Sequence, residues 1–64
     1  MILTIFTNGD PSVGIAGETV TLDWPGLETD TDLQETAIES IRQTFEKLMD
    51  GKVYIFEEST EQFY

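Results

Sequence analysis

Apolar residues recur at spacings of three and four along the stretch from Asp30 to Gly51. This spacing is typical of an amphipathic α-helix, because residues three and four apart lie on the same face of a helix. The positions expected to face a core are Leu33, Ala37, Ile38, Ile41, Phe45, Leu48 and Met49. The pattern therefore predicts one helix that packs on the rest of the chain.

Both ends of this helix carry residues suited to satisfying free backbone groups. The spacing of a capping box occurs twice at the start, in Thr31 with Gln34 and in Asp32 with Glu35. At the other end, Gly51 is expected to adopt the left-handed conformation that commonly closes a helix. The helix is therefore predicted to lie between these signals.

Three short segments are predicted as β-strands. Residues 1–7 are rich in β-branched and aromatic side chains and end at an Asn-Gly turn signal, and residues 52–57 are similar in composition. Residues 18–24 alternate between apolar and polar side chains, which predicts a strand with one solvated face. Residues 8–17 contain three glycines and a proline and are predicted to form a long loop.

The order strand, strand, helix, strand predicts a single α+β domain over residues 1–64. A hairpin joins the first two strands, and a right-handed helical crossover then brings the third strand beside the first. The expected sheet is three-stranded and of antiparallel type (ββαβ), with strand order 2-1-3 and the helix on one face. A chain of this length buries only ~60% of the surface that its unfolded form exposes.

The face of this sheet away from the helix is also apolar. Because one helix covers only one side of a small sheet, a second element must cover the other side. The residues expected there are Ile2, Phe6, Tyr54 and Phe56. Two elements are candidates for this cover. One is the C-terminal segment 58–64, folded back through Phe63 and Tyr64 instead of forming a flexible acidic tail. The other is a second copy, in a homodimer through this face or through strand edges.

The net charge of the chain limits the kinds of partner that it is expected to bind. Thirteen acidic residues against three basic ones give a formal net charge of -10. Such a charge attracts basic surfaces and disfavours nucleic acid and anionic membranes. The chain has no apolar run of the ~20 residues that cross a bilayer and no basic flank of a signal peptide at its start. A cytoplasmic location is therefore expected.

The residues that common catalytic and metal-binding sites require are missing from the sequence. The chain has neither histidine nor cysteine, and no serine lies in a nucleophile motif. The loop at residues 8–17 lacks the Lys-Ser/Thr ending of a phosphate-binding loop. A calcium loop that starts at Glu28 fails at Leu33, where glycine is required for the turn. The sequence thus predicts a binding protein, with no cofactor and no metal.

The acidic residues themselves form the candidate binding surface. Glu35, Glu39, Glu46 and Asp50 recur at helical spacing, so they are expected along one rigid side of the helix. Acids before the helix and after the third strand extend this row. The full set of candidate partner-binding residues, all expected to be solvated, is Asp30, Asp32, Glu35, Glu39, Glu46, Asp50, Glu57 and Glu58.

Small size, strong acidity, lack of cysteine and an acidic helix on a small sheet resemble the DNA-mimic inhibitors that bacteriophages make against host DNA-binding proteins. The resemblance is one of type, since such mimics share charge and no common motif. It implies competitive exclusion of DNA from a basic host protein during host takeover, in the host cytoplasm. The first expected target is a histone-like HU nucleoid protein, and direct nucleic-acid binding is not expected.

Two rival interpretations use the same residues differently. A small adaptor or antitoxin-like module would engage its partner through the apolar sheet face, with acidity serving solubility. An acidic face can also be no more than a solvated face, or a sign of a halophilic source. Salt dependence separates the DNA mimic from the adaptor, because only charge-driven binding weakens steeply with salt. Charge does not distinguish an antitoxin-like partner of a basic toxin from a DNA mimic.

Overall fold

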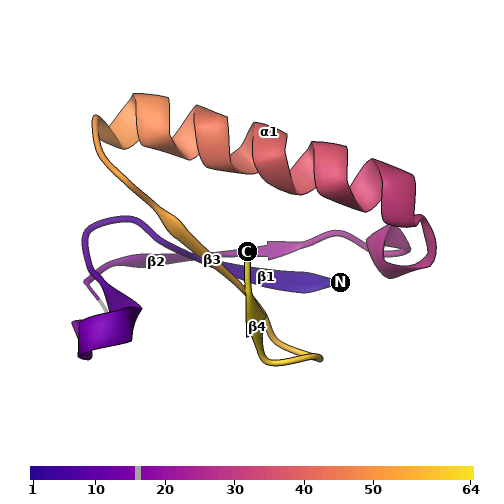
Figure 1. Cartoon of the computed structure of the whole chain (residues 1–64), viewed down its shortest axis with the longest axis horizontal. Coiled ribbons are helices and arrows are strands. Elements are labelled where there is room, and N and C mark those ends of the chain that lie inside the picture. Colours follow the sequence, from indigo (N-terminus) through magenta and orange to yellow (C-terminus); the bar gives the residue numbers. More distant parts are fainter. Residues whose placement is uncertain (16) are drawn as a thin grey trace.

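The computed structural model describes residues 1–15 and 17–64, while Ala16, which falls in the predicted loop, lies outside the described residues. Four strands, β1 (Ile2–Phe6), β2 (Thr19–Asp23), β3 (Tyr54–Glu57) and β4 (Gln62–Phe63), form one sheet. Its order is β2-β1-β3-β4, and all neighbours are antiparallel. The helix α1 (Thr31–Met49) crosses one face (Figure 1). The α+β class and the order 2-1-3 are confirmed, and the short strand β4 is an addition.

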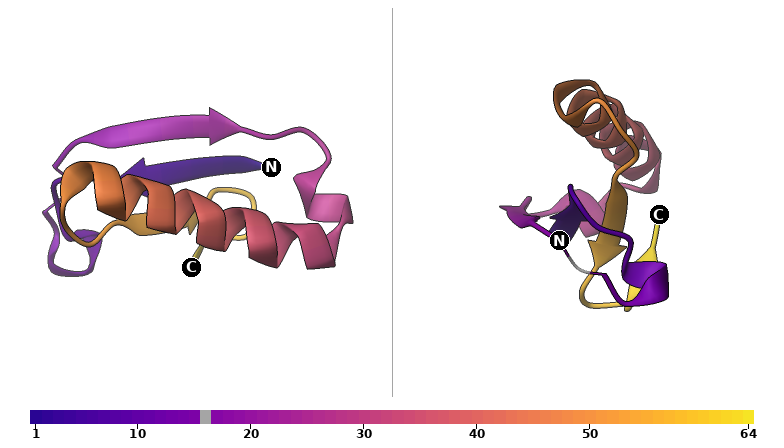
Figure 2. Two further views of the ribbon diagram at one scale, coloured as in Figure 1. Left: turned by 90° about the horizontal axis from the view of Figure 1, so that it is seen from above. Right: turned by 90° about the vertical axis from the view of Figure 1, so that its left-hand side faces the viewer.

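The core lies between α1 and the two central strands. Ile5 of β1 pairs with Ile55 of β3, and both side chains are fully buried. The remaining members of the buried cluster are Leu3, Leu27, Ala37, Ile38 and Val53. Leu27 belongs to η2 (Leu27–Thr29), a short 3-10 turn that leads into α1. The two layers are seen end-on in Figure 2.

The ends of α1 differ from the sequence-based expectation. Asp30 caps the start, where its carboxylate accepts a hydrogen bond from the Leu33 amide at 3.0 Å, so neither expected capping box supplies the cap. At the far end the left-handed residue is Asp50, with φ 51° and ψ 44°, and not Gly51. Aspartate is among the residues that tolerate this conformation, because its short side chain can hydrogen-bond locally.

The apolar stripe of α1 is only partly buried. Ala37 and Ile38 are buried, but Leu33 and Leu48 remain 44% and 72% exposed and Met49 remains 37% exposed, so the prediction that these three face the core is wrong. Nineteen helical residues extend ~28 Å, whereas the five residues of β1 extend ~17 Å. The helix therefore overhangs the sheet that it packs on.

The C-terminal segment 58–64 folds back as β4 along β3. The Phe63 ring lies 4.8 Å from the Phe56 ring and 6.2 Å from the Phe6 ring, centroid to centroid. The loop that carries the short turn η1 (Pro11–Val13) lies on the same side of the sheet, away from α1 (Figures 1 and 2). Of the two expected covers for this face, the C-terminal segment is thus present within the chain.

Candidate partner-binding surface

Every acidic residue within α1 lies on one side of the helix. At 100° per residue, these side chains project within an arc of about 60°. They are Asp32, Glu35, Glu39 and Glu46, and this set, together with Asp50 at the C-cap of α1, is called the acidic flank below. The flank faces the β3 side, because Glu46 accepts a hydrogen bond from the Val53 amide at 3.3 Å. The predicted row of acids is therefore held by one rigid element.

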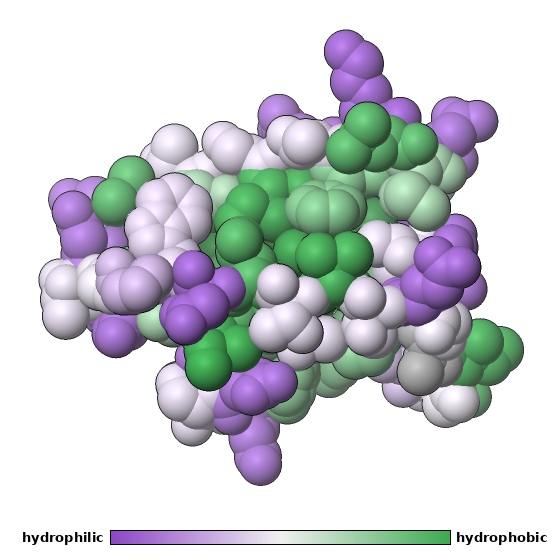
Figure 3. Space-filling model, turned by 180° about the vertical axis from the view of Figure 1, so that it is seen from behind, coloured by the Kyte–Doolittle hydropathy of each residue, from purple (hydrophilic) through white to green (hydrophobic). Residues whose placement is uncertain are grey.

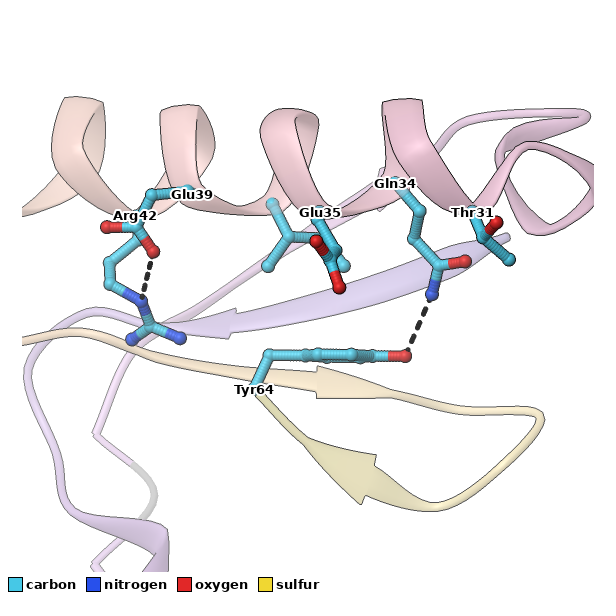
Figure 4. A pocket seen from close by; sticks show the side chains of 7 residues that line it. Thr31, Gln34, Glu35, Glu39, Arg42 and Tyr64 are labelled. Atoms are coloured by element: carbon cyan, nitrogen blue, oxygen red, sulfur yellow. Dashed lines mark hydrogen bonds and ion pairs between the residues drawn. The ribbon is translucent and has the colours of Figure 1, made fainter.

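A hollow of about 410 Å³ lies beneath this flank (Figure 4). Glu35 and Glu39 line it from above, and Tyr64 closes it from below. The Tyr64 hydroxyl accepts a hydrogen bond of 3.0 Å from the Gln34 amide. Tyr64 thereby covers the β4 side of the space between helix and sheet and supports the first half of the flank.

One cation lies next to the acidic flank. The Arg42 guanidinium is 3.7 Å from the Glu39 carboxylate and donates a hydrogen bond of 3.2 Å to the Val53 carbonyl. Arg42 is half-buried and ties α1 to the start of β3. Because the Glu39 carboxylate is exposed, solvent screens this ion pair, which contributes little to stability and leaves the other acids of the flank without it.

Glu57 was predicted to belong to the partner-binding site, but the structure places it in the interior. Its side chain shares a face of β3 with Ile55 and is 1% exposed, so the expectation that every acid is solvated is wrong here. The carboxylate accepts hydrogen bonds from the backbone amides and hydroxyls of Ser59 and Thr60, at 2.5 to 3.2 Å. These bonds, those from the hydroxyls first, hold the pKa of Glu57 at about 2. Glu57 shapes the turn before β4 and is not available to a partner.

The other predicted acids lie apart from the flank. Asp30 is exposed but serves as the helix cap, and Glu58 accepts a hydrogen bond of 3.3 Å from the Thr4 hydroxyl on the face away from α1. Glu28 pairs with the Met1 ammonium at 2.8 Å, and that hydrogen bond lowers the pKa of Glu28. The structure thus brings together five of the eight predicted acids.

The residues expected at a dimer interface lie on the face away from α1. Phe6, Tyr54 and Phe56 are half-buried within the single chain, and Ile2 is 41% exposed. The Lys52 ammonium lies 5.2 Å from the centre of the Tyr54 ring. Burial raises the pKa of Tyr54, and the neighbouring Asp10 carboxylate adds to this effect. Much of the apolar surface expected at the interface is therefore used inside the chain.

Sequence reasoning missed the opposite flank of α1. Thr36, Ser40 and Thr44 line an apolar groove beside Trp24 there. Their spacing of four was the available signal, since hydroxyl residues at that period share one side of a helix.

Over residues 1–15 and 17–64, no group of three or more acidic, histidine or cysteine side chains is arranged to hold a metal ion. The helix of the described chain is too polar to span a membrane. Comparison of the chain with models of known protein families, with curated proteins and with solved structures gives no match.

Proposed function

We propose that the acidic flank of α1 binds the basic surface of a DNA-binding protein and competitively excludes DNA from it. The observation that carries this proposal is the gathering of the four acids of α1 on one arc of the helix, with Asp50 following at its C-cap. They are spread over ~27 Å of helix axis, a length over which one strand of duplex DNA carries roughly eight phosphates. The flank therefore has more than half the linear charge density of a DNA strand.

The scaffold supports this role because it holds the charges in place before a partner arrives. Ala37 and Ile38 fix α1 to the sheet, Asp30 caps its start, and Tyr64 supports the flank from below. A helix backbone that needs no rearrangement on binding leaves only the acidic side chains to be ordered. The net charge of -10 also steers a basic partner toward the protein and raises the association rate at low salt.

The first test replaces Glu35, Glu39 and Glu46 together by glutamine. Glutamine keeps the shape and, at position 46, an oxygen that can accept from the Val53 amide. We expect affinity for a basic DNA-binding protein to fall by about 10- to 100-fold at low salt, mainly through slower association, and the difference to shrink at high salt. Competition with labelled duplex DNA on an HU-type nucleoid protein, followed by a panel of other DNA-binding proteins, measures this.

The matched control is the triple variant Glu18→Gln, Asp23→Asn and Glu61→Gln. It changes the formal charge equally, from -10 to -7 by removal of three acids, but leaves the acidic flank intact. The control is expected to retain most of the wild-type affinity. Equal losses in both triples would show that net charge matters and the arrangement of charges does not, which contradicts the proposal.

The homodimer through the face away from α1 is a separate part of the proposal. It is supported by Ile2 and Phe63, which are 41% and 53% exposed on that face. Two copies of charge -10 repel each other, so we expect dimerisation to strengthen with salt, opposite to binding of a basic partner. Sedimentation equilibrium at low and high salt tests this, with Ile2→Thr expected to weaken the dimer. A monomer under all conditions would exclude it.

A further inference from the structure

The helix α1 is too narrow to cover its sheet. Four strands span ~19 Å at ~4.8 Å each, whereas a helix is ~10 Å wide and covers about two strands. α1 lies over β1 and β3, whose inward side chains Leu3, Ile5 and Ile55 are fully buried. Toward β4, Tyr64 reaches under α1 and its hydroxyl accepts a hydrogen bond from the Gln34 amide. On the other side, Val20 of the edge strand β2 points toward the helix layer and is 41% exposed.

On this side an apolar groove of about 360 Å³ runs along α1 beside Trp24, the residue that follows β2. Its lining residues are Trp24, Leu33, Thr36, Ala37, Ser40, Ile41, Thr44 and Phe45. Figure 3, which views the molecule from behind, shows a continuous hydrophobic area across the middle of this face. The groove, defined by these eight residues, is thus an exposed apolar surface on a side of α1 that differs from that of Glu35, Glu39 and Glu46.

The composition of the groove is unusual for this chain. None of its eight lining residues is charged, although a quarter of the chain is. Its helical wall carries the short side chains of Thr36, Ser40 and Thr44, one turn apart. Short side chains let a second helix approach closely, since the distance between packed helices depends on the side chains at the contact. The wall therefore suits a helix that lies alongside α1 over β2.

Charge selects among the molecules that could occupy the groove. A second copy would bring another -10 to the same place, so at low salt repulsion makes it a poorer occupant than a cationic partner. Asp30 and Asp32 are exposed at the end of the groove next to Leu33, while Lys47 lies in the last turn of α1. A cationic helix is attracted by the net charge and finds complementary acids at that end. A partner strand that pairs with the edge of β2 would leave the groove uncovered, so a helix is the better occupant.

We propose that this groove of α1, beside Trp24, is the docking site for an amphipathic helix of a cationic partner. The apolar face of that helix lies on Trp24, Ile41 and Phe45, and its basic residues lie toward Asp30 and Asp32. The site shares Asp32 with the acidic flank, but its lining contains none of the flank's other acids, so its apolar contacts do not depend on DNA mimicry.

The test uses a synthetic amphipathic peptide of Leu, Ala and Lys, about 18 residues long, which as a helix spans ~27 Å and matches α1. Trp24 is the single tryptophan of the chain and lines the groove, so its emission reports occupancy. Titration with the peptide is expected to shift Trp24 emission to shorter wavelength. A peptide with Glu in place of Lys, and a scrambled Lys peptide of equal charge, are expected to give no shift.

Two variants locate the binding. Ser40→Tyr fills the groove and is expected to weaken peptide binding by about tenfold or more. Gln43→Tyr places the same ring on the solvent side of α1 and is expected to change it less than about twofold. Calorimetry gives the affinities without relying on Trp24, and circular dichroism checks that both variants are folded.

Three outcomes would overturn the inference. They are equal binding of the scrambled peptide, equal affinities of the two tyrosine variants, and a concentration-dependent shift of Trp24 emission in the protein alone that Ser40→Tyr abolishes. The last would assign the groove to a second copy. The triple variant of the acidic flank provides the separation from the function proposed above. If that triple variant loses affinity for the DNA-binding protein and Ser40→Tyr keeps it, the proposed function stands and the groove takes no part in it.

Discussion

Replacing Gly17 by alanine is expected to destabilise the protein by about 3 kcal/mol or more, enough to unfold most of a domain this small. Gly17 has φ +61°, and a Cβ atom there would lie 2.4 Å from the carbonyl carbon and oxygen of Asn8 and 2.6 Å from the Gly9 nitrogen. All three are backbone atoms, so no side-chain rotation relieves the clash. The adjacent hydrogen bond from the Thr7 amide to the Glu18 carbonyl, at 2.9 Å, joins β1 to β2 and would be displaced.

Gly14→Ala is the matched control. Gly14 has φ +80°, so alanine there meets the same backbone preference, but no atom lies within 4 Å of its added Cβ. We expect a loss of about 1 kcal/mol, from backbone conformation alone. Urea unfolding followed by circular dichroism measures both variants. Similar losses at the two positions would show that close backbone packing at Gly17 does not support the hairpin.

Acid is expected to remove a specific part of the stability through Glu57. The pKa of this carboxyl is 4.5 when unperturbed and about 2 in the folded protein, because hydroxyls and amides of Ser59 and Thr60 hydrogen-bond its charged form. A lowered folded-state pKa means that the contribution is complete above pH 4.5 and is lost as pH falls toward 2. Glu57→Gln should therefore be less stable than wild type at pH 7, with the difference shrinking below pH 4.5.

The difference between variants is the quantity to measure, because the other acids act in the opposite direction. Protonating them relieves the self-repulsion of a chain of charge -10 and raises stability as pH falls. Glu58→Gln is the control. Glu58 is the exposed neighbour of Glu57, and this substitution removes the same charge. Urea unfolding at several pH values gives the difference in free energy of unfolding between wild type and each variant. A pH-independent difference between wild type and Glu57→Gln would show that the hydrogen bonds of Glu57 do not set its pKa.

The acidic flank was predictable from the chain, whereas the role of Glu57 was missed. Helical period alone places Glu35, Glu39 and Glu46 on one side, since a helix fixes the direction of each side chain by its position. Strand alternation likewise puts Glu57 in phase with Val53 and Ile55. That phase was an available sign of burial, but whether a buried carboxylate is tolerated depends on donors that the following turn must supply.

The groove and the exposed end of α1 illustrate a further limit. The sequence marks Leu33 and Leu48 as apolar positions in a helical pattern, but it does not state how wide or long the sheet beneath them is. Leu48 is 72% exposed because α1 extends beyond the strands, and Leu33 is exposed because β2 lies outside the reach of one helix. These outcomes depend on the relative sizes of two packed layers.

The sequence by itself determined the helix, the first three strands, their order and the charge of the acidic flank. Those features follow from local periodicity, from turn residues and from the handedness of crossovers, which are properties of neighbouring positions along the chain. Only the tertiary structure decided which acid is buried, which glycine lies directly against another backbone segment and which side of α1 stays open. Each of these depends on atoms from segments distant in sequence, such as Gly17 against Asn8 or Tyr64 against Gln34, and packing between such segments sets them.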